Sequence, residues 1–272
     1  MPGRRTFSGI AATRDELWIC GGADGVEGES GAPANRHPRS ECFVFHPASG
    51  SWRDAPPMST ARIECWSCFV NGRVYTFGGA SHSAGGRSFA SVESIAPNGE
   101  KEWRAEPSMP LMFGLRQFGG CVLDGKVYLV GGCDEHSGSP SNRAFLCFDP
   151  TSGIWEHSAT SDPDGATLPA HPAPPNAPLV AAHAGKVWVI AGNPPGQQGA
   201  RNYGADDSGI APSPVYVYTP GGSWQRGPDF PTHQSWGAAH SFKGKLYAIS
   251  GAHGTGGRGN ITFDPRCFVM EE

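Results

Sequence analysis

A pair of glycines ends a short apolar run again and again along this chain. The pair follows residues 17–20, 74–77 and 127–130 as Gly21-Gly22, Gly78-Gly79 and Gly131-Gly132, and Ala191-Gly192 and Ser250-Gly251 hold the same place later. The spacing is about 50 to 60 residues, which is typical of repeat architectures in which each copy is one supersecondary unit. The chain is therefore expected to fold as five copies of one unit.

Each copy contains further parts in a constant order. A two-residue turn such as Asn71-Gly72 or Asp124-Gly125 precedes the apolar run, which predicts a tight β-hairpin. A second β-rich run then ends in proline, and a tryptophan follows it in four copies, at Trp52, Trp103, Trp155 and Trp224. We therefore predict four short antiparallel strands per copy. The tryptophans are expected to be buried between neighbouring sheets.

The last copy is less regular than the others. Residues 261–264 are expected to form its third strand and residues 266–270 its fourth, with Phe268 near the place of the missing tryptophan. One four-stranded sheet cannot bury both of its faces alone, whereas several packed side by side around an axis can. The sequence thus predicts an all-β protein, a β-propeller of four-stranded antiparallel blades, with five blades favoured and six as the alternative.

These motifs together resemble the kelch repeat. The double glycine, the aromatic residue two or three positions before it and the spaced tryptophan carry the resemblance, and residues 110–155 form the best copy. The resemblance covers nearly the whole chain and implies a single kelch-type propeller over residues 1–272. The expected blades span residues 5–58, 59–109, 110–162, 176–228 and 233–270.

Composition limits the classes of function. The 272 residues carry a net charge of −4, which gives no indication of a nucleic-acid-binding protein. No apolar run approaches the roughly 20 residues of a membrane helix, and no apolar stretch follows the first arginines, so neither a membrane span nor a signal peptide is expected. The eight cysteines fall mainly within predicted strands. We expect them to be thiols in an intracellular protein of the cytoplasm.

Connectivity predicts where binding residues gather. The turns between first and second strands have two residues, whereas the connections after each double glycine are long, so the loop material lies at one end of the blades. Residues just before each first strand reach that end, and they are Arg5, Arg62, Arg116, Asn176 and Gln234. We expect the three arginines to occupy equivalent places in three consecutive blades. Arginine presents a planar fork of donors that suits carboxylates. In kelch domains that capture peptides, arginines at this place hold acidic side chains; alternatively, each arginine caps its blade or pairs with a neighbour such as Glu64.

A second group of polar residues follows the double glycines. His82, His136 and His253 belong to it, together with carboxylates such as Asp24. No closely spaced ligand pair accompanies these histidines, so we expect no metal site and no cofactor. We expect His82, His136 and His253 to be polar loop side chains that contribute to binding of the partner or ligand at this face.

Two functions from different classes remain. The first is a non-catalytic module that binds a protein or acidic peptide at the long-loop face, as a subunit or adaptor of a larger assembly. The resemblance supports it, and no catalytic constellation is apparent in the sequence. The alternative is a small propeller enzyme of isomerase, lyase or oxidase type that acts on an anionic small molecule at the channel mouth.

Overall fold

The structure is a computed structural model of short β-strands joined by turns and loops. It describes residues 2–3, 5–24, 37–81, 86–111, 114–133, 144–158, 165–173, 175–190, 192, 212–232, 234–249, 251–254, 261–263 and 265–270. The chain divides into two compact units. Unit 1 comprises Met1–Arg116 and Pro150–Ile154, and unit 2 comprises Gln117–Asp149 and Trp155–Glu272.

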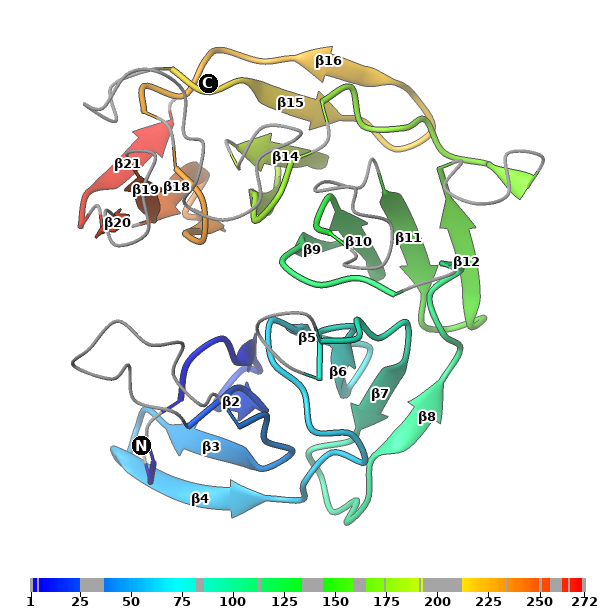
Figure 1. Cartoon of the computed structure of the whole chain (residues 1–272), viewed down its shortest axis with the longest axis vertical. Coiled ribbons are helices and arrows are strands. Elements are labelled where there is room, and N and C mark those ends of the chain that lie inside the picture. The colour runs from blue at the N-terminus through cyan, green and yellow to red at the C-terminus, as the bar shows by residue number, and fades with distance from the viewer. Residues whose placement is uncertain are drawn as a thin grey trace. The chain divides into compact units, whose positions relative to one another are not determined.

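Unit 1 holds two four-stranded antiparallel sheets, and in each of them the strands follow one another in chain order (Figure 1). The first sheet consists of β1 (Gly9–Ala12), β2 (Leu17–Cys20), β3 (Cys42–His46) and β4 (Ser51–Ala55). The second consists of β5 (Trp66–Val70), β6 (Arg73–Phe77), β7 (Val92–Ile95) and β8 (Arg104–Glu106).

Unit 2 holds three further sheets. The third sheet consists of β9 (Gly119–Leu123), β10 (Lys126–Val130), β11 (Phe145–Asp149) and β12 (Ile154–His157), whose first residue belongs to unit 1. The fourth consists of β13 (Leu179–His183), β14 (Lys186–Ile190), β15 (Val215–Tyr218) and β16 (Trp224–Arg226). The fifth consists of β17 (Ala238–Phe242), β18 (Lys245–Ile249) and β21 (Cys267–Met270). The predicted all-β propeller of antiparallel blades is confirmed.

The fifth sheet differs from the prediction in one detail. We expected residues 261–264 to be its third strand, but β20 (Ile261–Phe263) pairs instead with β19 (Ala252–Gly254) in a separate hairpin. The third position is taken by β21, which pairs directly with β18. Strand β18 pairs with β17 along one edge, and its other edge can pair with one further strand. Both β20 and β21 have a sequence suited to that position, and the sequence pattern does not decide between them.

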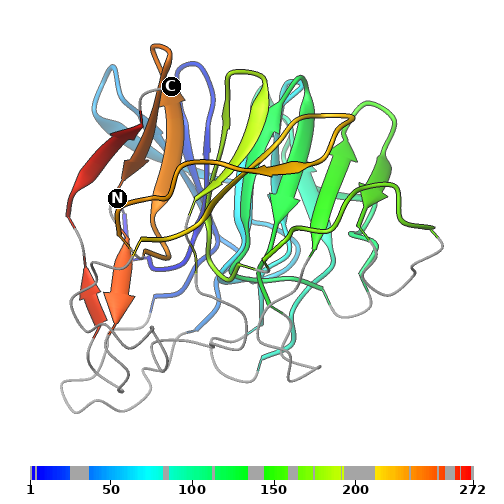
Figure 2. The ribbon, with the colours of Figure 1, turned by 90° about the horizontal axis from the view of Figure 1, so that it is seen from above.

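The predicted tight turns are present. At Asn71-Gly72 the φ angles are 48° and 80°, and at Asp124-Gly125 they are 51° and 75°. Two successive positive φ values match the twist of a two-residue hairpin and explain why asparagine, aspartate and glycine occupy these positions. In each unit these turns lie at one end of the strands, the upper end in Figure 2, so the double glycines lie at the other.

The core lies between neighbouring sheets. In unit 1, Trp18 and Val44 of the first sheet pack against Val74 of the second. In unit 2, the third sheet packs on the fourth through Tyr128 and Val189. The fourth packs on the fifth, and these contacts include Ile190, Val215, Leu246 and Ala248.

The four repeated tryptophans are not equivalent in burial. Trp103 is 6% exposed, and its indole Nε1 donates to the Pro56 carbonyl at 2.8 Å. Trp224 is half-buried and lies between the third and fourth sheets as predicted, with its ring centroid 4.8 Å from that of Phe145. Trp52 and Trp155 are also half-buried, and for them the prediction of burial between sheets is wrong. Trp52 and Trp155 lie instead on Phe45 and Phe148 of their own sheets, with ring centroids 4.8 and 4.7 Å apart.

All eight cysteines lie in the described part of the chain, and none of them forms a disulfide. Seven are buried and Cys267 is exposed. In the described part of the chain, no helix is long and apolar enough to cross a membrane.

Candidate functional site

A residue with positive φ stands just before the first strand of each sheet. The five residues are Phe7, Glu64, Gln117, Ala177 and Trp236, with φ between 50° and 57°. None of them is glycine, and bulky side chains rarely adopt this backbone conformation. Strained backbone of this kind persists where surrounding contacts impose it, and it is common at binding sites. We call the segments that contain these residues the entry turns: residues 5–7, 62–64, 115–117, 175–177 and 234–236.

Backbone hydrogen bonds link successive entry turns within each unit. In unit 1, the Glu64 amide donates to the Phe7 carbonyl at 2.8 Å. In unit 2, the Ala177 amide donates to the Gln117 carbonyl at 2.7 Å, and the Trp236 amide donates to the Ala177 carbonyl at 3.1 Å. These bonds hold each positive-φ residue at a fixed place relative to the next, which makes the entry turns a rigid platform for side chains.

The double glycines bind the entry turns of the following sheet. The second residue of the pair donates its amide to one carbonyl of that turn: Gly22 to Arg62, Gly79 to Leu115, Gly132 to Pro175 and Gly192 to Gln234, at 2.8 to 2.9 Å. The first glycine lies so close that a Cβ on Gly131 would come within 2.1 Å of the Pro175 carbonyl oxygen. The repeated glycine is therefore explained by the close approach of two backbones.

These hydrogen bonds correct the predicted equivalence of the arginines. Arg62 corresponds to Leu115 and not to Arg116, because Leu115 accepts the bond from the glycine pair. In the fourth sheet, Pro175 is the residue that corresponds to Arg62, and Asn176 is one residue further along the chain. Successive residues of an extended segment point to opposite sides. The expectation that Arg62 and Arg116 occupy equivalent places is therefore wrong.

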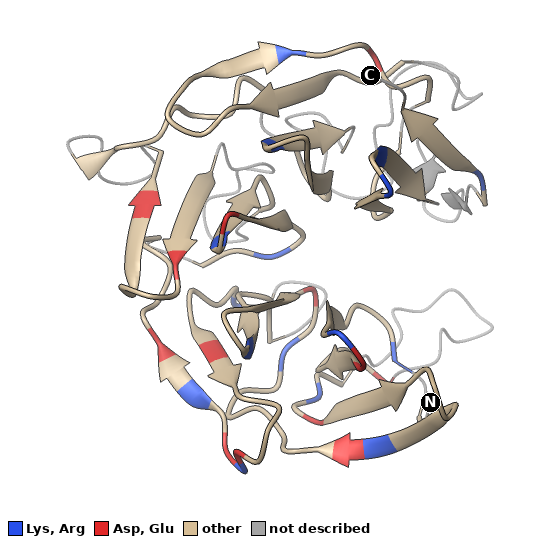
Figure 3. Cartoon of the chain, turned by 180° about the vertical axis from the view of Figure 1, so that it is seen from behind, with Lys and Arg blue, Asp and Glu red and all other residues tan. Residues whose placement is uncertain are grey.

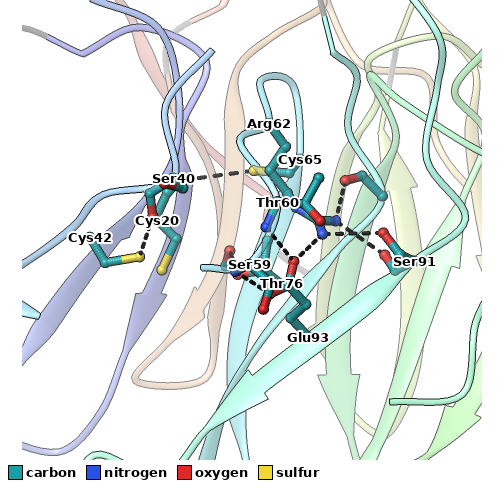
Figure 4. A network of polar contacts seen from close by, with 12 residues as sticks. Cys20, Ser40, Cys42, Ser59, Thr60, Arg62, Cys65, Thr76, Ser91 and Glu93 are labelled. Carbon is teal, nitrogen blue, oxygen red and sulfur yellow. Dashed lines mark hydrogen bonds and ion pairs between the residues drawn. The ribbon is translucent and has the colours of Figure 1, made fainter. Parts of the chain in front are cut away.

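Arg62 is enclosed within the second sheet (Figure 4). Its Nη1 donates to the Gly78 carbonyl at 2.7 Å and to the Ser91 carbonyl at 3.1 Å, and its Nη2 lies 2.5 Å from Glu93 Oε1. The guanidinium thus secures the glycine pair of its own sheet and is fully buried. The geometry does not favour the direct contact with a partner that we predicted for Arg62.

Glu93 completes this buried network. Its carboxylate accepts the backbone amides of Ser59 at 2.7 Å and Thr60 at 3.2 Å, in addition to the Arg62 bond. Buried charges need a partner and further hydrogen bonds to offset their lost hydration, and both are present here. The network therefore anchors the segment that leads into the second entry turn.

Arg116 also faces a carboxylate. Its Nη1 lies 3.3 Å from Glu64 Oε2, and the two side chains are 5% and 4% exposed. Pairing with Glu64 is the alternative that the sequence left open. Because both ions are buried, the carboxylate offsets the positive charge that we had expected to attract an acidic partner.

The remaining predicted residues differ in accessibility. Arg5 lies over the Phe43 ring at 5.1 Å from its centroid, and its Nη2 is 3.8 Å from Glu41 Oε2. Asn176 and Gln234 are buried, at 1% and 0% exposure. His82 and His136 lie outside the described residues, and of His253 only the strand position, in β19, is described.

Three of the positive-φ residues have accessible side chains, and sequence reasoning missed all of them. Phe7 in unit 1 is 38% exposed, and Gln117 and Trp236 in unit 2 are half-buried. Within the described chain, no hydrogen-bond partner is present for the buried indole Nε1 of Trp236. A buried tryptophan N–H ordinarily finds an acceptor, so this donor stands out among the described residues. No residue pattern could have indicated it, because a positive φ at a non-glycine residue leaves no signal in the sequence.

Cysteines whose thiol pKa is raised are poor nucleophiles at neutral pH. Burial raises the pKa of the Cys65 thiol to about 12 and that of the Cys147 thiol to about 11. The thiolate is the nucleophilic form, and it is scarce at neutral pH for such groups. Among the residues that the structure describes, no three histidine, cysteine, aspartate or glutamate side chains gather as a metal site would require.

Repeated antiparallel sheets packed face to face, with glycine pairs bound to the following entry turn, define a β-propeller. Residues 114–160 match the family model described as Kelch motif. The chain is 25% identical over 132 residues to Kelch-like protein 33 of Homo sapiens, covering 48% of this chain and 22% of that protein. It is 32% identical over 119 residues to Beta-scruin of Limulus polyphemus, covering 42% of this chain and 12% of that protein. The chain therefore contains a kelch motif and is similar to kelch-repeat proteins over part of its length.

A solved structure titled "Structure of YjhT" has the same fold. The TM-score is 0.71 at 16% sequence identity, and the match covers 99% of this chain and 83% of that chain. At this identity the likeness shows the fold alone. The chain matches about a quarter or less of the length of the curated relatives named above.

Proposed function

We propose that this chain is a protein-binding module without chemistry of its own, and that its partner binds at the end of the blades where the entry turns lie. The main observation is the platform of linked entry turns in unit 2, which presents Gln117 and Trp236. Trp236 combines a large apolar ring with a donor that has no acceptor among the described residues. Aromatic side chains of this kind are enriched among the residues that dominate binding energy.

The family supports the same proposal. Kelch-repeat propellers commonly bind protein partners, which fits a role as subunit or adaptor of a larger assembly. The loop residues His82, His136 and His253 are proposed to contribute to this face. We also place the module inside the cell, in the cytoplasm, because its eight cysteines form no disulfide.

An acidic partner is supported by one arginine instead of three. Arg62 and Arg116 are each paired with a buried carboxylate. The Nη2 of Arg5, in unit 1, lies 3.8 Å from Glu41 Oε2, and the Glu41 side chain is 48% exposed. We propose that Arg5 forms a separate contact with an acidic side chain of the partner.

Affinity capture from the native source, read by quantitative mass spectrometry, tests the proposal. Trp236→Ala should lower recovery of the partner at least roughly tenfold, because an aromatic anchor at a binding hot spot contributes about 2 kcal/mol or more. Lys126→Ala is the control, since Lys126 lies beside a turn at the opposite end and pairs with the partly exposed Glu156. Equal loss with both variants, or no loss with Trp236→Ala, would contradict the proposed face.

A further inference from the structure

The third strand of the fifth sheet has one edge that pairs with no strand among the described residues. β21 pairs with β18 along its other edge, and the sheet has the order β17-β18-β21. In the other four sheets a fourth strand lies beyond the third, and these strands are β4, β8, β12 and β16. The edge of a strand presents backbone amides and carbonyls that can pair with a strand of another chain. The outer edge of β21 is therefore where a fourth strand fits.

Two other short β segments of this chain already have partners. β20, which precedes β21, pairs with β19 in a separate hairpin. Thr6, which precedes the first sheet, exchanges backbone hydrogen bonds with Ala23, and the N···O distances are 3.0 and 2.9 Å. Neither segment extends the fifth sheet, which leaves the edge of β21 to a strand from another protein.

Met270 of β21 holds the position that faces a tryptophan in other sheets. One third-strand residue pairs with the residue four positions before the glycine pair, and these pairs include Leu17 with Phe45, Val127 with Phe148, Val187 with Tyr218 and Leu246 with Met270. The rings of Phe45, Phe148 and Tyr218 each contact a tryptophan of the fourth strand, with centroids 4.8, 4.7 and 5.4 Å apart. Met270 is half-buried against the core between the fourth and fifth sheets. An aromatic side chain on a fourth strand would therefore lie on Met270, and contacts between a thioether and an aromatic ring are favourable.

A positive charge lies beside this edge. β21 itself contains no charged residue (Figure 3), but the Arg266 guanidinium lies 5.1 Å from the centroid of the Phe268 ring. Phe268 is two residues before Met270 and therefore lies on the same face of the strand. In the first sheet its counterpart is Phe43, which pairs with Asp54, two residues after the tryptophan of β4. An acidic residue at that place on a fourth strand would lie beside Arg266.

We propose that β21 binds an extended segment of a partner protein as a fourth, antiparallel strand of the fifth sheet. The segment carries an aromatic residue opposite Met270 and an acidic residue two positions later, beside Arg266. Backbone hydrogen bonds along β21 supply affinity and the two side chains supply specificity, as in other proteins that add a peptide to the edge of a sheet. This site is separate from the entry turns, and it does not depend on the function proposed above.

Fluorescence polarisation of the full chain with a labelled peptide tests this inference. The probe is Gly-Ser-Trp-Arg-Asp-Ala-Pro, which copies residues 50–56 and so contains the fourth strand of the first sheet. It should bind saturably, and replacing its tryptophan by alanine should weaken binding at least about tenfold, as for an aromatic anchor. Met270→Glu should abolish binding. Ile154→Glu is the matched control, because it places the same charge on the outer strand of another sheet, where Ile154 is 62% exposed.

Methylation of the peptide backbone distinguishes strand addition from other modes of binding. In an antiparallel pair, alternate residues direct their amides toward the neighbouring strand. A peptide methylated on the amides of one alternate set should therefore lose binding, whereas a peptide methylated on the other set should keep it. This comparison uses the wild-type chain, so it decides the question even if Met270→Glu fails to fold. Equal affinities of the two methylated peptides overturn the proposal, as does the absence of saturable binding at millimolar probe.

A second peptide tests the acidic position. Gly-Ser-Trp-Gln-Arg-Gly-Pro copies residues 222–228 and carries arginine where the first probe carries aspartate. The aspartate peptide should bind the wild-type chain more tightly, and Arg266→Glu should reverse that preference. A preference that Arg266→Glu leaves unchanged overturns the acidic requirement, and binding that a folded Met270→Glu retains overturns the site itself. Circular dichroism of each variant shows whether it is folded.

Discussion

The guanidinium of Arg62 and the carboxylate of Glu93 form an ion pair inside the second sheet, with 2.5 Å between Nη2 and Oε1. The two side chains are 0% and 5% exposed. Through this pair, the backbone amides of Ser59 and Thr60 and the carbonyls of Gly78 and Ser91 join one network. The arginine that the sequence indicated as a binding residue therefore holds its own sheet to the preceding connection.

Removing one member of this pair should destabilise the protein strongly. Arg62→Ala leaves the Glu93 carboxylate buried without its counter-ion, which typically costs about 3–5 kcal/mol of unfolding free energy. Urea denaturation followed by tryptophan fluorescence measures the change. Arg226→Ala removes a pair whose side chains are 53% and 47% exposed, and it should cost about 1 kcal/mol or less. Comparable losses for the two variants would show that the Arg62 pair is not effectively buried.

The energetic cost of the close backbone approach at Gly131 can be measured separately from the cost of its positive φ. Gly131 and Gly185 have φ of 70° and 71°, but a Cβ on Gly131 would lie 2.1 Å from the Pro175 oxygen, whereas a Cβ on Gly185 would meet nothing within 4 Å. Gly185→Ala should cost only the backbone penalty, about 1–2 kcal/mol. Gly131→Ala should cost clearly more, since the backbone of the entry turn must move. Equal melting temperatures for the two variants would disprove the packing role.

Trp103 should matter more for stability than the other repeated tryptophans. Trp103→Ala removes a buried indole and its hydrogen bond to Pro56, and we expect a loss of about 3–5 kcal/mol. Trp52→Ala removes a half-buried ring that lies on Phe45 of its own sheet, so its cost should be smaller. Chemical denaturation of both variants measures the difference, and the reverse order would contradict the burial that the structure shows.

The thiols should fall into two kinetic classes. At pH 8, a disulfide reagent should titrate one thiol quickly, that of the exposed Cys267. Burial raises the pKa of Cys65 to about 12, so a change from pH 7 to pH 9 produces little of its reactive thiolate. Cys267→Ser should remove the fast phase, and denaturant should expose the remaining seven thiols. Several fast thiols in the native protein would contradict the buried positions of the others.

Sequence alone determined the repeat, the antiparallel strands, the tight turns and the kelch-type propeller, because these depend on local patterns. Asparagine or aspartate before glycine imposes a hairpin turn, and a continuous apolar run predicts a strand that is buried on both faces. The positions of Asn71-Gly72 and Asp124-Gly125 could therefore be read directly.

Tertiary structure decided the side-chain partners and the exact equivalence of positions. Whether Leu115 or Arg116 corresponds to Arg62 depends on which carbonyl the glycine pair of the preceding sheet binds. A shift of one residue turns a side chain to the opposite side, and no local pattern records that choice. The burial of Arg62 against Glu93 and the positive φ of Trp236 likewise arise from contacts between distant segments.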